Sequence, residues 1–505
     1  MSTIDQAAPD LVPSTGEAHG DAHGALAPDP RRWKALGVIA IAQLMIVLDS
    51  SIVNIALPSA QRALHISTVN RQWVVTAYTL AFGGLLLLGG RIADYMGRKK
   101  MFIVGLVGFG TASALGGLAP NADMLFGARA LQGAFGALMA PAALSILSVT
   151  FTEAKERATA FGVYGAIAGG GAAIGLVLGG VLTEYASWRW TLLVNTPIAV
   201  VAAISALRLV SESRAEGDRH YDLPGAATVT AGLVALVYGF TLADTHGWSS
   251  TSTLGSLAAA IVLLAAFVAI ELRTSHPLLP MRVFLDRNRG GSFLGSFLAG
   301  IGLFGMFLFL TYYLQGTLGY SALKAGFAFL PFSGTVIVAA VLASKALPRF
   351  GPRPLMTLGF LAAALVTAWL TTIGVHSSFA SHVLPAEIVM SAGLGFAFVS
   401  LTATALVGVA DHDAGVASAL VNTTQQVGGS LGTALLNTIA ASATTSYLAV
   451  HARSTVATAT GLVHGYTTAF VYAAGFLGVA TIASALLVRA SKEHVAAVDA
   501  AMVPA

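Results

Sequence analysis

Long apolar stretches of about twenty residues alternate along this chain with short polar or glycine-rich connectors. A helix needs roughly 20 apolar residues to span the hydrocarbon core of a bilayer, so each stretch predicts a transmembrane helix. The pattern shows none of the strict alternation that marks a β-strand. It predicts an all-α polytopic membrane protein with fourteen helices, near residues 35–57, 71–89, 101–119, 122–149, 158–183, 190–209, 223–243, 253–272, 291–315, 322–344, 354–374, 384–409, 415–442 and 466–488.

The composition agrees with this prediction. Hydrophobic residues make up 56% of the chain and charged residues 10%, and the mean hydropathy is +0.77. Such a chain has too little polar surface to cover a soluble globule. The absence of cysteine excludes disulfides, thiolate metal sites and cysteine nucleophiles. No GxxxxGK[ST] run is present to hold nucleotide phosphates, which argues against a pump driven directly by ATP.

The basic residues gather in alternate connectors. If the N-terminus is cytoplasmic, 21 of the 27 lysines and arginines fall in inside-facing segments. The positive-inside rule then predicts a multi-pass protein of the cell membrane, expected to be a bacterial plasma membrane, with both termini in the cytoplasm. Because the positive charge follows the loops, we expect membrane lipid and not nucleic acid as its surroundings. The basic residue that remains inside a helix, Arg129, is a candidate functional residue.

Charged connectors at 211–222 and 272–290 divide the helices into six, two and six. We therefore expect a disordered cytoplasmic tail, an N-terminal six-helix bundle, linkers with two extra helices, a C-terminal six-helix bundle and a second tail. The corresponding boundaries are 1–33, 34–209, 210–290, 291–490 and 491–505.

A weak internal repeat supports two related halves. The loop GGRIADYMGRKK (89–100) is echoed by ASKALPRFGPRPLM (343–356). Matching positions are separated by a constant 254 residues: Lys345 for Arg91, Gly351 for Gly97 and Arg353 for Lys99. Parallel repeats of this kind form transporter halves that rock about a site near the midplane.

Two charged residues in helix interiors are the first candidates for chemistry. Asp49 lies eight residues before Leu57, and Arg129 lies seven residues after Ala122. At about 1.5 Å per residue both are roughly 10–12 Å deep, so they can meet. Such a pair can serve as a proton switch, in which a proton or a cationic substrate competes with Arg129 for Asp49. The alternative is a permanent structural ion bridge.

Other polar residues on predicted helices are candidates for a substrate cavity. Gln132 lies one turn from Arg129 and could orient its guanidinium group or contact substrate, although an interhelical hydrogen bond is an equal alternative. Glu387 is a second possible proton or cation site, or an interfacial acid without a special role. The residues assigned to the cavity are Gln132, Gln43, Tyr78, Gln315 and Glu387.

Glycines in the predicted fifth helix recur every four residues, at Gly171, Gly175 and Gly179, with Gly180 adjacent. This spacing places a smooth face on the helix, as expected for close helix packing.

Several segments resemble motifs of one membrane-protein family, the major facilitator superfamily. GGRIADYMGRKK resembles its loop between helices two and three, LDSSIVNIALP (48–58) the first-helix motif of the drug/proton antiporters, and RALQGAFGALMAPA (129–142) their fourth-helix motif. SWRWTLLVNTPI (187–198), YDLPGA (221–226), PLLPMRVF (277–284), LQGTLGYSALKAG (314–326) and AGVASALVNTTQQVGGSLGTA (414–434) are similar to segments of the fourteen-helix subfamily. The resemblance covers roughly residues 35–488.

The resemblance implies the major facilitator fold and roles for particular residues. It assigns a gating loop to Gly90, Asp94, Gly97, Arg98 and Lys99. In the family, the loop carboxylate bridges to a helix start in the opposite bundle, which here would be Asp413–Gly415. The chain departs from the family at Tyr95, where an arginine is usual, and at Leu176, where the antiporter motif has a proline.

The function expected from these features is proton-coupled export of amphipathic drugs or toxic organic compounds by alternating access. The partners are a lipophilic or cationic small molecule and protons, with no cofactor, no metal and no enzymatic activity, and the chain is expected to act as a monomer. One alternative is a dedicated exporter of a single endogenous metabolite, peptide or lipid. Another, from a different class, is a membrane sensor that does not transport.

Overall fold

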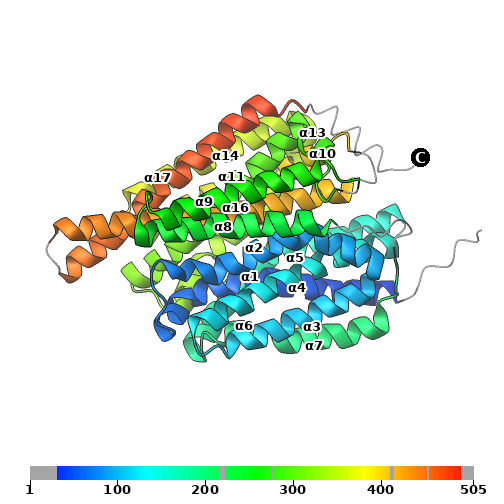
Figure 1. The fold of residues 1–505 in the computed structure, drawn as a ribbon, viewed down its shortest axis with the longest axis horizontal. Coiled ribbons are helices and arrows are strands. Elements are labelled where there is room, and N and C mark those ends of the chain that lie inside the picture. The colour runs from blue at the N-terminus through cyan, green and yellow to red at the C-terminus, as the bar shows by residue number, and fades with distance from the viewer. Residues whose placement is uncertain are drawn as a thin grey trace, which may run out of the picture.

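The computed structural model describes residues 31–151, 153–214, 222–275, 277–409, 414–451 and 454–490. The regular structure of these residues is helical. The helices form an N-terminal group, a central pair and a C-terminal group, and most of them run along the long axis of the molecule (Figure 1). The predicted tails lie outside the described residues, apart from residues 31–33, where the first helix begins at Arg32.

The N-terminal group contains α1 (Arg32–Ala63), α2 (Trp73–Met96), α3 (Arg98–Gly117), α4 (Ala122–Thr150), α5 (Ala154–Tyr185), α6 (Trp190–Leu193) and α7 (Asn195–Leu209). The central pair is α8 (Leu223–His246) and α9 (Thr251–Glu271). The C-terminal group contains α10 (Met281–Phe284), α11 (Arg287–Tyr312), α12 (Ala322–Ala328), α13 (Leu330–Phe350), α14 (Pro352–Trp369), α15 (Leu384–Leu406), α16 (Ala414–Val450) and α17 (Thr455–Leu487).

Each of the fourteen predicted segments corresponds to one of these helices or to two consecutive ones, α6 with α7 and α12 with α13. Twelve of the segments are long and apolar enough to cross a bilayer. The other two, α5 and α16, have 32 and 37 residues, which exceeds the roughly 20 residues required. The protein is therefore an all-α polytopic membrane protein.

The sequence prediction made α16 and α17 too short: α16 ends at Val450 instead of near 442, and α17 begins at Thr455 instead of near 466. The two helices continue through much of the predicted loop 443–465 and form a hairpin that extends beyond the other helices (Figure 1, orange). Close packing explains the extension, because a Cβ at Gly465 would lie only 2.5 Å from the Ala440 carbonyl oxygen.

The two groups contact each other through α2 and α16 and through α5 and α12. The central helix α8 packs against both α2 and α16, while α9 packs on α8. The central pair therefore covers the contact between the two groups on one side. We call the end of the bundle that carries Gly97 the loop end, and the opposite end the far end.

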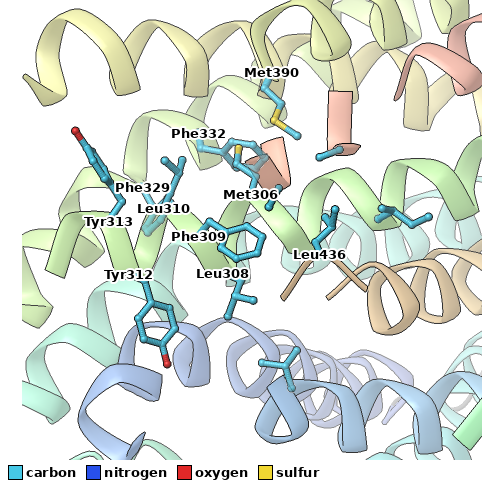
Figure 2. Packing of buried hydrophobic residues seen from close by; sticks show 14 of the residues in the cluster. Met306, Leu308, Phe309, Leu310, Tyr312, Tyr313, Phe329, Phe332, Met390 and Leu436 are labelled. Carbon is cyan, nitrogen blue, oxygen red and sulfur yellow. The ribbon is translucent and has the colours of Figure 1, made fainter. Parts of the chain in front are cut away.

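A large hydrophobic cluster crosses between the two groups and extends through the C-terminal group. Figure 2 shows its aromatic and methionine side chains, among them Phe309, Phe329 and Met390. Tyr312 and Tyr313 are neighbours in sequence but point in different directions (Figure 2). The Tyr312 hydroxyl donates to Gln61 on α1, whereas that of Tyr313 donates to the Gly374 carbonyl oxygen at 2.8 Å within its own group.

The two loops of the internal repeat have equivalent turns. Gly97 ends α2 with φ of 114°, and Gly351 ends α13 with φ of 76°. Both conformations favour glycine, since a side chain is strained there. Each glycine N–H bonds to the carbonyl oxygen four residues earlier, and a new helix starts at the next residue.

Candidate functional site

A buried ion pair joins α1 and α4 inside the N-terminal group. Arg129 Nη1 donates to Asp49 Oδ2 across 2.6 Å, and the side chains are 1% and 0% exposed. Taking two charges out of water costs several kcal/mol per ion, so such a pair needs further hydrogen bonds. The structure thus brings together the two charged residues that the sequence had singled out.

Three neutral side chains complete the cluster. Asp49 Oδ1 accepts from Gln132 Nε2 at 2.9 Å and from Asn195 Nδ2 at 2.8 Å. Gln132 also donates to Ser113 Oγ at 2.6 Å and accepts from Arg129 at 2.9 Å through its Oε1. Donors from α4 and α7 therefore reach both oxygens of Asp49, an arrangement that suits an ionised carboxylate.

The second helix fixes Arg129 from the other side. Arg129 Nε donates to the Val74 carbonyl oxygen at 2.9 Å, and its guanidinium carbon lies 4.5 Å from the Tyr78 ring centre, within cation–π range. The approach of α2 to α4 depends on Gly133, because a Cβ there would collide with the Tyr78 carbonyl oxygen. The glycines of α4 thus position its charged residue.

This cluster can change state when it takes up a proton. Protonated Asp49 would carry no charge, and Arg129 would then have only neutral partners: the carboxyl group itself, a side-chain amide, a backbone carbonyl and an aromatic ring. A buried cation without a counter-charge is unfavourable by several kcal/mol. Protonation therefore favours a conformation in which Arg129 reaches water or a different partner.

The remaining residues predicted for the cavity lie in different places. Tyr78 and Gln132 belong to the enclosed Asp49 cluster and are fully buried. Gln43 is half-buried on α1. Gln315 lies just after α11 and donates to the Ile55 carbonyl oxygen at 3.0 Å, so it joins the two groups of helices.

Glu387 lies near the start of α15 in the C-terminal group. It is 0% exposed, and in the described structure neither carboxyl oxygen has a hydrogen-bond partner. Its side chain is therefore enclosed by the protein, within the C-terminal group and apart from the Asp49 cluster.

The predicted gating loop is tied to the linker after α7. Asp94 pairs with Arg98 at 2.7 Å, while Glu212 caps the start of α3 by accepting from the backbone N–H groups of Lys99 and Lys100 at 3.1 and 3.2 Å. An anion at a helix N-terminus is favourable. The predicted partner of Asp94, Asp413–Gly415, lies outside the residues whose side chains are described.

The small residues of α5 face two different helices. Cβ atoms at Gly171, Gly175 and Gly179 would press on α1, with 3.0 Å from Gly175 to the Leu48 carbonyl oxygen. Gly180 faces α12 instead, where a Cβ would lie 2.6 Å from Leu323 Cα. The glycine repeat therefore allows close packing both within the N-terminal group and between the two groups.

A polar network that the sequence did not indicate joins the two groups at the far end. Buried Arg71 donates from Nε to Asn437 Oδ1 at 3.0 Å, and its guanidinium carbon lies 3.8 Å from the Tyr312 ring centre. Asn437 in turn donates to the Thr68 carbonyl oxygen at 3.0 Å. Glu184 adds a contact by accepting from Leu323 N at 3.0 Å.

Comparisons with known proteins find relatives along most of the chain. The model of the Major Facilitator Superfamily matches residues 39–433. The puromycin resistance protein of Streptomyces alboniger is 50% identical over 469 residues, which cover 92% of this chain and 93% of that protein. The cephamycin export protein of Amycolatopsis lactamdurans is 39% identical over 414 residues, which cover 81% and 85%.

Solved structures share the fold at low sequence identity. A bacterial homologue of the human lysosomal transporter Spinster, in an inward-facing and unoccupied conformation, matches with a TM-score of 0.65 and 15% identity. The match covers 91% of this chain and 98% of that protein. At this identity the similarity concerns the fold.

Proposed function

The chain belongs to the major facilitator superfamily, and from this premise we propose that it is a proton-coupled antiporter that exports amphipathic drugs or related toxic organic compounds. The observation that carries the proposal is the enclosed Asp49–Arg129 pair. An ionisable pair inside a membrane bundle is costly and is typical of proton pathways. Asp49 is thus our candidate for the residue that carries the proton.

In the proposed cycle, Asp49 alternates between a protonated and an ionised form, and each turn of the cycle carries one proton. With the far end open, Asp49 binds a proton from that side and its ion pair with Arg129 breaks. With the loop end open, Asp49 releases the proton and the pair forms again. Substrate binds when the loop end is open and leaves at the far end, so inward proton movement drives export by alternating access.

This direction requires the loop end to face the cytoplasm, as the distribution of basic residues predicts. We propose that Asp94 and Arg98 act there as part of a gate, and that the far-end network around Arg71 closes the opposite side. Gln43, Gln132, Tyr78 and Gln315 are proposed to contact substrate in states that open the bundle. A single chain contains both halves and is proposed to act as a monomer.

The names of two relatives favour a second candidate. Each is named for one antibiotic, puromycin in one case and cephamycin in the other. A dedicated exporter of one endogenous compound would use the same proton chemistry with a narrower binding cavity. Comparing efflux of a lipophilic dye such as ethidium with efflux of puromycin from the same vesicles separates a broad exporter from a dedicated one.

The test of the proposed function is transport by purified protein in vesicles. An imposed pH gradient should drive accumulation of at least one compound from a panel of lipophilic dyes and antibiotics, and a proton ionophore should abolish it. Movement of every transported compound without any response to the gradient would argue against coupling. Absence of all transport would favour the sensor alternative.

A further inference from the structure

The two central helices bring two acidic side chains together at the loop end of the bundle. Asp222 caps α8, where its Oδ1 accepts from Gly225 N at 2.8 Å. Glu271 is the last residue of α9, and its Oε2 accepts from Leu279 N at 2.9 Å. Because α8 and α9 are joined by a short turn and pack on each other, the start of α8 and the end of α9 lie at the same end of the pair, which places the two carboxyl groups next to each other. They are only 7% and 3% exposed.

One oxygen of each carboxyl group lacks a donor. Asp222 Oδ2 and Glu271 Oε1 are buried without a hydrogen-bond partner in the described part of the chain. Two ionised carboxylates this close repel each other, and burial strengthens the repulsion. One proton between the two free oxygens removes this repulsion and supplies the missing hydrogen bond, as in other carboxyl pairs that titrate together.

The neighbouring charges favour a single proton on the pair. In the described structure, the charged groups that act on Glu271 are Asp222 and Arg91 on α2. The singly protonated pair carries one negative charge, which one arginine balances. A doubly ionised pair would carry a net negative charge in a buried site, and a fully protonated pair would leave Arg91 without a counter-charge.

The same groups hold the linker that follows α9. Glu271 binds the backbone of Leu279, while Arg91 Nη2 donates to the Pro277 carbonyl oxygen at 3.3 Å. Glu271 of the central pair and Arg91 of α2 therefore bind the linker at two positions that are two residues apart. Arg91 is also the residue that matches Lys345 in the internal repeat.

The linker segment 277–280, which these hydrogen bonds hold, lies between the two groups of helices. Leu279 is buried in a small hydrophobic cluster with Phe293 of α11 and Val421 of α16, and Leu87 of α2 packs against this cluster. Its neighbour Leu278 is 4% exposed. A change in the hold on Leu279 therefore acts directly on a contact between the two halves of the protein.

We propose that Asp222 and Glu271 form a second proton-binding site, separate from Asp49, whose bound proton locks the linker 277–280 between the two halves. Loss of this proton makes the two carboxylates repel each other, which moves Glu271, and the Leu279 backbone that it binds, away from Asp222 and loosens the packing of the linker. The consequence for transport rests on the proposed function. The pH gradient drives transport, and the pH at the loop end would in addition control its rate through this second site. The proton-binding site itself does not depend on transport.

The chain contains no cysteine, so a single introduced cysteine can report on the linker. Leu278→Cys places a thiol in the buried segment, and Ser275→Cys places one at an exposed position of the same linker. The ratio of their labelling rates by a maleimide, with equal pH on both sides of the vesicle, cancels the pH dependence that the two thiols share. The ratio should rise at least about fivefold as pH increases, in the range of ordinary coupling energies.

Two further substitutions, each combined with the reporter cysteines, test whether this rise depends on the carboxyl pair. Glu271→Gln should abolish it, because an amide can donate to Asp222 and accept from Leu279 at every pH. Asp222→Asn provides an independent second variant with the same expected result. Asp123→Asn, an exposed acid at the start of α4, should leave the rise intact.

A ratio that does not change with pH would overturn the proposal, as would an equal rise in the Glu271→Gln and Asp222→Asn backgrounds. The same vesicles can be assayed for transport. If labelling responds to pH through Glu271 but no compound is transported, the proposed function fails and the proton site stands. If transport is proton-coupled but the labelling ratio is flat, the site fails and the function stands.

Discussion

Asn195 Nδ2 lies 2.8 Å from Asp49 Oδ1 and connects α7 to α1. Asn195 is the first residue of α7, one residue after α6 ends, and Val194 between the two helices keeps a helical backbone. Side chains of α4 and α7 therefore both bind Asp49 of α1. Loss of the Asp49 charge would weaken its contacts with both neighbouring helices.

Replacing Asn195 by alanine should lower the free energy of unfolding by about 1.5–3 kcal/mol, because it removes a hydrogen bond to buried Asp49. Unfolding of the purified protein in detergent tests this loss. Asn54→Ala is the matched control, since Asn54 is on α1 and its amide donates to the Ser50 carbonyl oxygen of the same helix at 3.0 Å; an equal loss there would refute the assignment.

Arg129→Gln should destabilise the protein by about 3–5 kcal/mol, because it leaves the buried charge of Asp49 without its partner. The double variant with Asp49→Asn should recover part of this loss, since it removes both charges together. Unfolding of the purified protein in detergent measures both effects. Strictly additive losses would show that the two residues are not coupled.

Gly175→Ala should destabilise the contact between α5 and α1 by about 1–3 kcal/mol, because the new methyl group would overlap the Ser51 hydroxyl and press on the Leu48 carbonyl oxygen of α1. Gly170→Ala, at a position with open space around it, should be neutral or stabilising by up to about 1 kcal/mol. Thermal unfolding of the two variants side by side provides the comparison. Equal effects would argue that glycine is not required for packing at position 175.

Arg71→Gln should loosen the far end, since it removes the stacking on Tyr312 and the charged donor to Asn437. A single cysteine in place of buried Ala325 on α12 should then react with an impermeant maleimide several-fold faster than in the parent. Arg62→Gln, an exposed arginine at the same end that contacts Ser59, serves as the control. Unchanged reactivity in the Arg71 variant would mean that this network does not close the far end.

The sequence was sufficient to predict the ion pair, because charge inside an apolar helix is rare and helix rise gives depth directly. It was not sufficient to predict Asn195 or Ser113. Neutral polar residues are common in membrane helices, and only the packing of α3 and α7 against α4 brings these two to Gln132 and Asp49. Asn195 lies in SWRWTLLVNTPI (187–198), which resembles a family motif, but the resemblance implies no role for this residue.

The acids of the connectors were harder to predict for a different physical reason. Glu212, Asp222 and Glu271 lie in or beside charged segments, where a solvated side chain is the ordinary expectation. Their roles arise because the linkers fold back on the helix ends, so that Glu212 caps α3 and Glu271 binds Leu279. Contacts that arise when a linker folds back on a helix end leave no periodic signal in the sequence.

The central claim is that the charge on Asp49 couples protons to transport, and it is tested most directly with Asp49→Asn in vesicles. Substrate accumulation against its gradient and equilibrium exchange without a pH gradient are measured on the same preparation. The parent should perform both, whereas Asp49→Asn should lose accumulation and retain exchange, because only the proton-driven step requires the carboxyl group. Undiminished accumulation by Asp49→Asn would contradict the account.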